Sequence, residues 1–329
     1  DLSVAHKKKI PVRLVKGAYW DTEIKIAQMG GMPDYPLYTR KSNTDVSYLA
    51  CAQKMLARSD AFYPMFATHN AHSIAAIQEM DKNSANTFEF QRLHGMGEGV
   101  YASIVPDHKV SIYAPVGPHR DLLPYLVRRL LENGANSSFV NKMLDPSIAP
   151  EDLITDPVEE SRNVRPKQHH LIPLPEDIFG PQRKNSAGLD FNAPEQSQKT
   201  VDSIKDYSLS VSSESLINGS SVPQIEEGGL EIEETFKSAS AGFKSWNATD
   251  VQLRAEAIER FADLLEQNRD ELMGILTYEA GKTLADGRDE VREAVDFCRY
   301  YAALAKEAYS SGGQKMRGYT GETNHLVHE

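Results

Sequence analysis

The feature that most constrains the fold is a fourfold alternation of short apolar runs and helix-compatible segments in the first 145 residues. The apolar runs, rich in β-branched or aromatic residues, predict strands at residues 12–15, 62–68, 88–93 and 110–114. The segments after them predict helices at residues 44–59, 72–82, 97–105 and 122–133, with Pro124 in the first turn of the last helix and Gly134 after its end. Such alternation is typical of parallel strands joined by helical crossovers. The sequence therefore predicts an α/β fold, either a (β/α)8 barrel or a doubly wound sheet.

Polar residues mark the C-terminal end of each predicted strand. They form four clusters, at residues 16–20, 68–70, 94–97 and 114–117. Four successive strands that all contribute at this end favour a barrel over a sheet with one switch point. A complete barrel takes about 250 residues, so these four units predict the C-terminal half of a (β/α)8 barrel. Because half a barrel exposes two unpaired edges, we expect the other half to lie upstream in a longer chain or to come from another molecule.

The rest of the chain divides into two further segments. Residues 146–235 are rich in proline, serine, asparagine and acidic residues, and they predict a linker with a docking segment and little core. Order is predicted to return at Thr249, where Thr249-x-x-Gln252 resembles a capping box ahead of a long helix. The expected domains are therefore residues 1–145, 146–235 and 236–329, the last all helical and too short to be complete.

Charge and composition argue against several classes of protein. The formal net charge of −11 argues against a nucleic-acid-binding arm in this segment. No run approaches the ~18 apolar residues of a membrane span, and the polar first residues do not fit a signal peptide. The two cysteines, Cys51 and Cys298, are too few for a disulfide framework or a multi-cysteine zinc site, and both are predicted to be small core residues. The cytoplasm is the expected compartment.

The first predicted strand contains an arginine on a face that should be enclosed. Alternation along residues 12–20 puts Arg13, Val15 and Gly17 on one face, so Arg13 would point into the apolar interior of a barrel. A buried charge is costly unless it meets a partner. The pattern leaves two partners open, an anionic or electron-rich cofactor and a carboxylate elsewhere in the barrel.

The last predicted helix carries two adjacent arginines. Arg128 and Arg129 supply two planar donor forks that suit a carboxylate, and Glu132 is spaced to orient them. This pattern predicts a site for a small carboxylic acid. A solvated helix face with ordinary ion pairs would show the same spacing.

A third polar motif, Thr68-His69-Asn70-Ala71-His72, follows the second predicted strand. Its side chains could donate hydrogen bonds to phosphates at a strand-to-helix turn. Alternatively, they could cap the following helix and pack locally. His69 and His72 are three residues apart across the turn, a spacing that disfavours the metal pair of a metal-dependent barrel hydrolase. We expect no metal site.

Taken together, these strings resemble the proline dehydrogenase barrel of the bacterial proline utilization A family, which is fused to an aldehyde dehydrogenase. The matching stretches occur in order and cover nearly all of the first 145 residues: 12–20, 38–41, 66–72, 90–97, 112–117 and 125–141. Residues 185–190, 279–283 and 290–297 are similar to the linker and the N-terminal helices of the fused aldehyde dehydrogenase.

The resemblance implies FAD-dependent oxidation of L-proline to pyrroline-5-carboxylate by hydride transfer to the flavin. The partner domain would then oxidise glutamate semialdehyde to glutamate with NAD. The resemblance makes Arg13 the catalytic residue beside the flavin, and it implies further FAD-binding residues: Lys16, Gly17, Ala18, Trp20, Thr68, His69, Asn70 and Gln91. The implied substrate-binding residues are Arg128, Arg129, Glu132, Tyr113 and Tyr19. A quinone electron acceptor and peripheral contact with the bacterial inner membrane are also implied.

The chain departs from the family pattern at both ends. The first half of the barrel is not matched, nor is the dehydrogenase body with its cysteine nucleophile and general-base glutamate. We therefore expect an internal fragment that lacks both activities by itself, with the missing barrel half and dehydrogenase body as its partners. The alternative is a non-catalytic remnant that acts as an interaction module.

Overall fold

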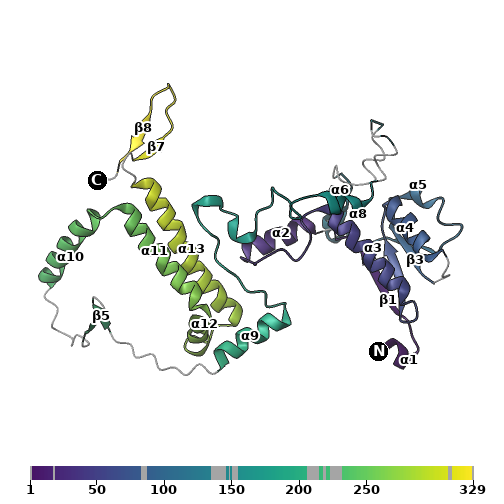
Figure 1. Cartoon of the computed structure of the whole chain (residues 1–329), viewed down its shortest axis with the longest axis horizontal. Helices are drawn as coiled ribbons and strands as arrows, with labels where there is room; N and C mark the ends of the chain where they lie inside the picture. The colour runs from purple at the N-terminus through teal and green to yellow at the C-terminus, as the bar shows by residue number, and fades with distance from the viewer. Residues whose placement is uncertain are drawn as a thin grey trace. The chain divides into compact units, whose positions relative to one another are not determined.

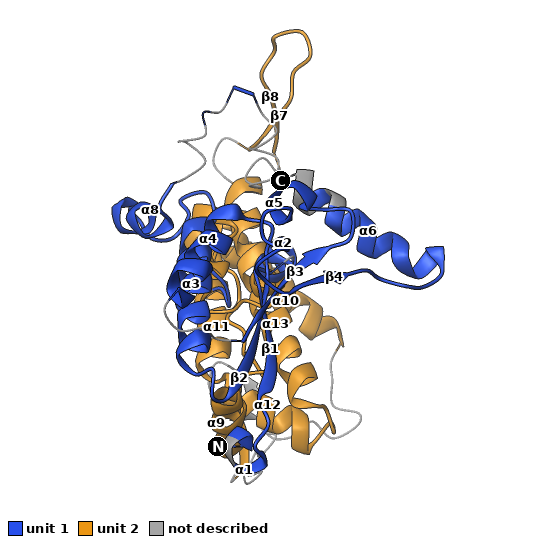
Figure 2. Ribbon diagram, turned by 90° about the vertical axis from the view of Figure 1, so that its right-hand side faces the viewer, with its two compact units in different colours: residues 1–25, 35–172 blue, residues 26–34, 173–329 orange. Residues whose placement is uncertain are grey.

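The computed structural model describes residues 2–17, 19–82, 87–134, 146–147, 149, 155–205, 215–217, 220–222, 232–309 and 313–327. The chain forms two units, coloured separately in Figure 2. One unit contains residues 1–25 and 35–172, and the other contains residues 26–34 and 173–329. Each unit has its own cluster of buried hydrophobic side chains.

The first unit is built on a parallel sheet of four strands: β1 (Ile10–Val15), β2 (Phe62–Ala67), β3 (Glu89–Leu93) and β4 (Val110–Tyr113). The strands pair in the order β1-β2-β3-β4. The four predicted strands and their parallel direction are thus confirmed. Sequential parallel pairing with intervening helices is the arrangement of neighbouring strands in a (β/α)8 barrel wall, and it brings all four C-terminal strand ends to one edge.

Helices precede, connect and follow these strands (Figure 1): α1 (Leu2–His6), α2 (Trp20–Met29), α3 (Lys41–Ala57), α4 (Ala71–Asp81), α5 (Glu98–Tyr101), α6 (His119–Gly134) and α8 (Pro157–Asn163). Helices α3 and α4 confirm the prediction to within a few residues. Helix α5 is shorter than the predicted helix at 97–105, because the chain continues in turns after Tyr101. Helix α2 was not predicted, and its last residues belong to the second unit.

Helix α6 begins earlier than predicted. The carbonyl of Pro118 accepts hydrogen bonds from the amides of Asp121 and Leu122, so the chain already turns before the predicted start. Pro124 therefore lies in the second turn and not in the first, and Gly134 is the last residue of the helix rather than the one after it. Because proline has no amide hydrogen, the carbonyl of Arg120 lacks its usual helical donor.

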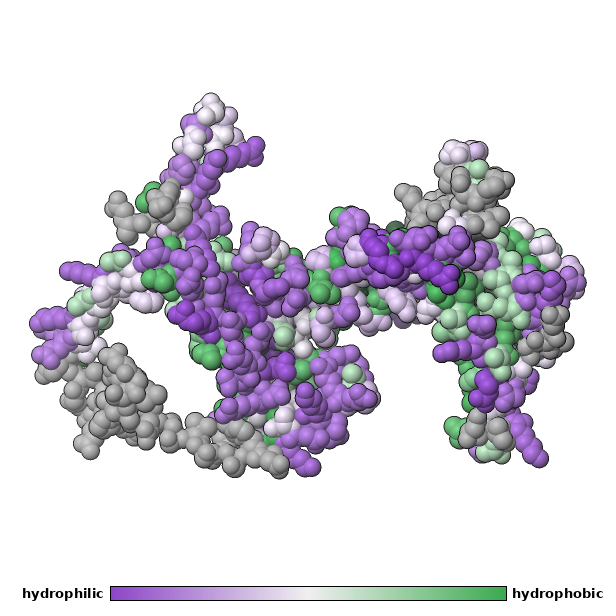
Figure 3. Space-filling model, in the orientation of Figure 1, coloured by the Kyte–Doolittle hydropathy of each residue, from purple (hydrophilic) through white to green (hydrophobic). Residues whose placement is uncertain are grey.

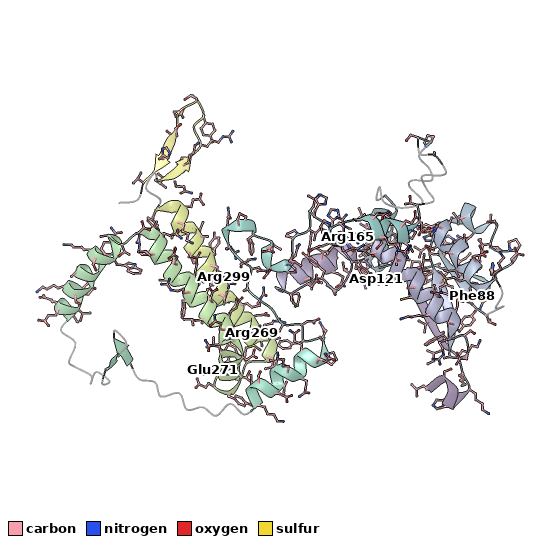
Figure 4. All side chains as sticks on the ribbon, viewed as in Figure 1. Phe88, Asp121, Arg165, Arg269, Glu271 and Arg299 are labelled. Atoms are coloured by element: carbon pink, nitrogen blue, oxygen red, sulfur yellow. The ribbon has the colours of Figure 1, made fainter. Side chains whose placement is uncertain are left out.

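One face of the sheet packs against the helices to form the core of the first unit. Phe66 and Phe90 are fully buried there. Phe88, labelled in Figure 4, packs edge-on against both, with ring centroids 5.5 Å from Phe66 and 5.3 Å from Phe90. Val12 and Leu14 of β1 pack against the same cluster. Alternation along β1 therefore sends the side chain of Arg13 to the opposite face.

The opposite face of the sheet is open and mixed in character. Arg13 is exposed, and its contacts are with Gln91 and Tyr113. Arg13 thus lies on the face away from the helices, as the alternation predicts, and β3 presents polar side chains beside it. Val15 on this face is 48% exposed. Figure 3 shows hydrophobic residues on the side of the first unit that faces the viewer.

The second unit is mainly helical. Its elements are the 3-10 helices η2 (Pro175–Asp177) and η3 (Gly180–Gln182), the helices α9 (Pro194–Lys205), α10 (Ile232–Asn247), α11 (Val251–Gln267), α12 (Arg269–Tyr278) and α13 (Leu284–Ala308), and the strands β5 (Ser215–Ile217), β6 (Ser220–Val222), β7 (Gln314–Met316) and β8 (Asn324–Leu326). Its core contains Ala262, Met273, Val291 and Val295. Arg299 of α13, labelled in Figure 4, joins α13 to α11 by an ion pair with Glu266 at 2.8 Å.

Three expectations about this unit are corrected. Helix α10 begins at residue 232, so order returns well before Thr249. The cap of α11 is Asp250, whose side chain accepts from the amide of Gln252, whereas the Thr249 hydroxyl donates to the carbonyl of Ser245. The segment is not all helical, because β7 and β8 pair in an antiparallel hairpin.

Part of the predicted linker is packed into the second unit. The side-chain amide of Asn185 donates to the carbonyl of Gln28 at 2.9 Å, and the amide of Gly188 donates to the carbonyl of Gly31 at 2.7 Å. Gly31 has φ +59°, and a Cβ there would lie 2.0 Å from the carbonyl oxygen of Ser186, so no larger residue fits without a shift. Residues 185–189 are therefore more closely packed than expected for a linker with little core.

The cysteines differ from each other in their surroundings. Helix α3 buries Tyr48, Ala52, Met55 and Leu56, and Cys51 falls at the edge of this stripe, where it is exposed. The prediction that Cys51 is a core residue is therefore wrong. Cys298 is half-buried and packs against the core of the second unit.

Candidate active site

The candidate site lies on the open face of the sheet in the first unit and is centred on Arg13. The Nε of Arg13 donates a hydrogen bond of 2.8 Å to the side-chain oxygen of Gln91. The Arg13 guanidinium also lies 5.6 Å from the centroid of the Tyr113 ring. The sheet register explains this grouping, because β1, β3 and β4 present these side chains on one face near the C-terminal strand ends.

The two arginines of α6 stack on tyrosines. The guanidinium of Arg128 lies 5.3 Å from the ring centroid of Tyr19, and that of Arg129 lies 5.0 Å from the ring centroid of Tyr125. Tyr125 is in turn 6.1 Å from Tyr113, measured between ring centroids. A chain of cation–π and ring contacts therefore runs from Arg129 through Tyr125 and Tyr113 to Arg13, while Arg128 contacts Tyr19 separately.

Tyr125 was missed by sequence reasoning. It precedes Arg129 by four residues on α6, and this i, i+4 spacing is the signal that could have identified it. Arg128 keeps donor capacity, because its buried Nε has no hydrogen-bond partner among the described residues. Glu132 was also predicted to belong to the substrate site, but its side chain falls outside the described part of the chain.

Lys16 points toward the helices that cover the sheet. Its ammonium group forms an ion pair of 2.5 Å with Asp45, contacts the Ser73 hydroxyl at 3.2 Å and lies 5.1 Å from the ring centroid of Tyr48. Burial lowers the pKa of Lys16, and Asp45 opposes this effect. For Asp45, burial acts to raise the pKa, but Lys16 and Lys41 together hold it below its usual value. The structure therefore does not bring the Lys16 ammonium to Arg13.

The turn from β2 to α4 uses its polar side chains locally. The side chain of Asn70 caps α4 by accepting from the amide of Ser73 at 3.1 Å. The Thr68 hydroxyl accepts from the amide of Asn70 at 3.1 Å, and the Tyr101 hydroxyl donates to the carbonyl of Thr68 at 2.6 Å. These contacts show the predicted capping role directly.

His69 ties the end of β2 to the end of β3. Its Nε2 accepts a hydrogen bond of 3.1 Å from the backbone amide of Leu93. An imidazole nitrogen that accepts is unprotonated, so in the neutral ring Nδ1 carries the hydrogen and remains a donor. Burial, together with the nearby charge of Arg92, lowers the pKa of His69.

Acidification is expected to destabilise the first unit through His69. Because its pKa is lower in the folded protein than in the unfolded chain, the folded state binds this proton less readily. This contribution to stability is present above the unfolded pKa of about 6.5 and is lost as the pH falls below that value. As the pH is lowered through this range, the urea midpoint should fall less steeply in His69→Gln than in wild type. Replacement of the exposed His119 by Gln should leave the pH dependence of the midpoint as in wild type. If the urea midpoint of His69→Gln fell with pH as steeply as that of wild type, His69 would not be the source of this acid sensitivity.

The remaining predicted cofactor residues lie near the start of α2. The indole Nε1 of Trp20 donates to the carbonyl of Tyr38 at 2.9 Å, which fixes the ring while leaving it 41% exposed. A Cβ built on Gly17 would meet no atom within 4 Å, so the space beside it is open. Ala18 falls outside the described residues.

Three residues beside the site were not predicted, namely Glu89, Tyr63 and Lys109. The carboxylate of Glu89 is buried and forms an ion pair with Lys109 at 2.9 Å. The Tyr63 hydroxyl donates to it at 3.1 Å. Alternation along β3 places Glu89 on the same face as Gln91, and a carboxylate two residues before Gln91 in a predicted strand is the signal that could have revealed it.

Two further features of the described residues concern metal binding and membranes. No group of three or more histidine, cysteine, aspartate or glutamate side chains in that part of the chain is placed to hold a metal ion. None of the described helices has both the length and the apolar character that crossing a membrane requires.

Comparison with protein families decides the relationship. Residues 1–142 match the proline dehydrogenase family, and residues 214–329 match the aldehyde dehydrogenase family. The chain thus contains one segment similar to each of these two enzyme families. The proline dehydrogenase match contains all four strands of the parallel sheet and every predicted site residue, so the resemblance seen in the sequence is confirmed.

Relatives and solved structures combine the same two segments. The chain is 42% identical to the bifunctional protein PutA of Klebsiella aerogenes, over 97% of this chain and 27% of that protein. It is 39% identical to the PutA of Rhizobium meliloti, over 92% of this chain and 27% of that protein. A crystal structure of a bifunctional proline utilization A protein matches with a TM-score of 0.82 and 44% identity, over 98% of this chain and 32% of that one. The chain thus spans about a quarter to a third of the length of these relatives.

Proposed function

We propose that this chain contributes part of the active site of an FAD-dependent proline dehydrogenase, which oxidises L-proline to pyrroline-5-carboxylate. The whole protein would also oxidise glutamate semialdehyde to glutamate with NAD. The single observation that carries the proposal is the ring-stacked arginine pair on α6, of which Arg129 is connected through Tyr125 and Tyr113 to Arg13, in a segment that matches the proline dehydrogenase family.

The residues at the open face suit a flavin. Arg13 offers a charged, planar donor group, Gln91 lies beside it, and the space next to Gly17 is free of protein atoms. His69 adds an Nδ1 donor near the strand ends. We propose that these residues hold FAD together with the others named by the resemblance: Lys16, Ala18, Trp20, Thr68 and Asn70. When bound, FAD would supply the chemistry of hydride acceptance.

The chain's own side chains would bind and orient the substrate. Arg128 and Arg129 would hold the carboxylate of proline in bidentate hydrogen bonds, with Glu132 orienting them. Stacking on Tyr19 and Tyr125 limits the motion of both guanidinium groups. Tyr113 contacts both Tyr125 and Arg13 and would form the wall of the pocket. Fixing the carboxylate in this way orients the carbon that loses the hydride.

The wider setting follows from the same proposal. Residues 1–145 would be the C-terminal half of the FAD barrel, 146–235 a linker and docking segment, and 236–329 the N-terminal helices of the aldehyde dehydrogenase domain. The rest of both domains would come from elsewhere in the whole protein. We propose a bacterial cytoplasmic location, with electrons passed to quinone at the inner membrane.

Flavin absorbance tests the proposal. The whole protein is expected to purify with bound FAD, and its visible flavin absorbance should bleach when L-proline is added without oxygen. A linear amino acid such as L-alanine serves as the matched control, because it has the same carboxylate but no ring. A protein that binds no flavin, or whose flavin is not bleached by proline, would overturn the proposal.

A further inference from the structure

A buried carboxylate stands behind the Arg13 site with no role in the function proposed above. Glu89 of β3 is only 5% exposed. Its carboxylate accepts from the Gln91 side chain at 2.8 Å and from the Tyr63 hydroxyl at 3.1 Å, and it pairs with Lys109 at 2.9 Å. Burial acts to raise the pKa of Glu89, but donors from Gln91, Lys109, Ser111 and Tyr63 hold it below its usual value. The ion pair with Lys109 and the two hydrogen bonds fit the charged form of the Glu89 carboxylate.

The side-chain amide of Gln91 is engaged at both ends. Its nitrogen donates to Glu89 at 2.8 Å, and its oxygen accepts from the Nε of Arg13 at 2.8 Å. A carboxylate can only accept hydrogen bonds, and a guanidinium can only donate them. The amide therefore has one allowed orientation, since a flipped amide would place donor against donor at Arg13 and acceptor against acceptor at Glu89.

The Gln91 side chain therefore connects the Glu89 carboxylate to the Arg13 guanidinium through two hydrogen bonds. We propose that Glu89 is a positioning residue, which fixes the amide of Gln91 and through it the guanidinium of Arg13. The inference rests on the proposed function, in which Arg13 faces the flavin. It adds that Nε of Arg13 is held by Gln91, while the two terminal nitrogens keep their donors for the cofactor and substrate.

A purely structural role for Glu89 makes a different prediction. Lys109 and Tyr63 also bind this carboxylate, and they could stabilise the sheet without affecting Arg13. In that case, loss of Glu89 would lower stability but leave the kinetics of the folded protein unchanged. Coupling between Glu89 and Gln91 separates the two roles, because residues that act through one another have non-additive effects.

The test uses the whole protein and compares Glu89→Gln, Gln91→Ala and the double variant. Glu89→Gln is expected to lower the rate of proline-dependent flavin reduction about ten- to a hundredfold, with the proline KM changed less than about twofold. Gln91→Ala should give a similar loss, and the double variant should be no slower than Gln91→Ala. Glu98→Gln is the matched control, and it should behave as wild type. Glu98 on α5 is exposed and forms a long ion pair of 3.8 Å with Arg92.

A second measurement does not depend on activity. Crystal structures of wild type and Glu89→Gln are expected to show that the Arg13 Nε to Gln91 oxygen contact is kept in the first and lost or reoriented in the second. An unchanged contact, or losses that add in the double variant, would overturn the inference. If wild type does not oxidise proline, the proposed function fails, and the crystal structures still decide whether Glu89 positions Arg13.

Discussion

Replacing Phe90 by alanine is expected to lower the free energy of unfolding of the first unit by about 3–5 kcal/mol. Phe90 is fully buried and lies at the centre of the core. Its ring packs against Phe66, Phe88 and Tyr101, with centroids 5.3 to 6.4 Å away. Truncation would remove these contacts and leave a cavity that the sheet backbone prevents from closing. Since domains are stable by only about 5–15 kcal/mol, this is a large fraction of the total.

The two tryptophans make this measurement specific. Trp20 lies in the first unit and Trp246 in the second, so in a Trp246→Phe background tryptophan fluorescence follows the first unit alone. Urea unfolding of Phe90→Ala in that background gives the change in stability. Leu123→Ala is the control, because Leu123 on α6 is 62% exposed. A loss below about 1 kcal/mol for Phe90→Ala would contradict the central place of this ring.

Replacing Arg128 by methionine is expected to raise the proline KM by about a hundredfold, if the proposed function holds. Removing one partner from a buried, hydrogen-bonded charge pair costs about 2–5 kcal/mol, and a factor of ten corresponds to about 1.4 kcal/mol. Arg128→Lys keeps the charge but loses the planar fork, so its effect should be intermediate. Proline titrations that follow flavin bleaching in the whole protein provide the measurement.

Arg120 offers a matched control on the same helix. It lies on α6, its side chain is 89% exposed, and its ion pair is with the neighbouring Asp121. Arg120→Met removes the same charge from α6 without touching the ring-stacked pair, and it should leave the proline KM unchanged. Equal effects of Arg120→Met and Arg128→Met would indicate a general electrostatic influence rather than carboxylate binding.

The strands of the first unit could be predicted because each carries its own signal. Apolar runs such as residues 62–67 favour burial, and the alternation with helices indicates their parallel direction. Helix ends were less predictable. The start of α6 depends on a turn at Pro118, and the cap of α11 is Asp250 rather than Thr249, because residues of similar capping strength stand side by side.

The candidate site likewise contains residues that the sequence could predict and contacts that it could not. Adjacent arginines and an arginine in a strand can be recognised in the sequence itself, and they led to the hypotheses about Arg13, Arg128 and Arg129. The partners of these residues come from other elements. Tyr19 meets Arg128 and Gln91 meets Arg13 only because separate strands and helices are brought together.

Local pattern alone determined the α/β class, the parallel direction of the strands and the residue types able to bind a carboxylate. Those properties arise from interactions between near neighbours in the chain, which periodicity records directly. Only the tertiary structure decided that Lys16 faces Asp45 instead of Arg13, that residues 26–34 pack with the second unit, and that Glu89 supports Gln91. Such contacts join residues far apart in sequence, and their energies depend on a geometry that exists only after the sheet has paired.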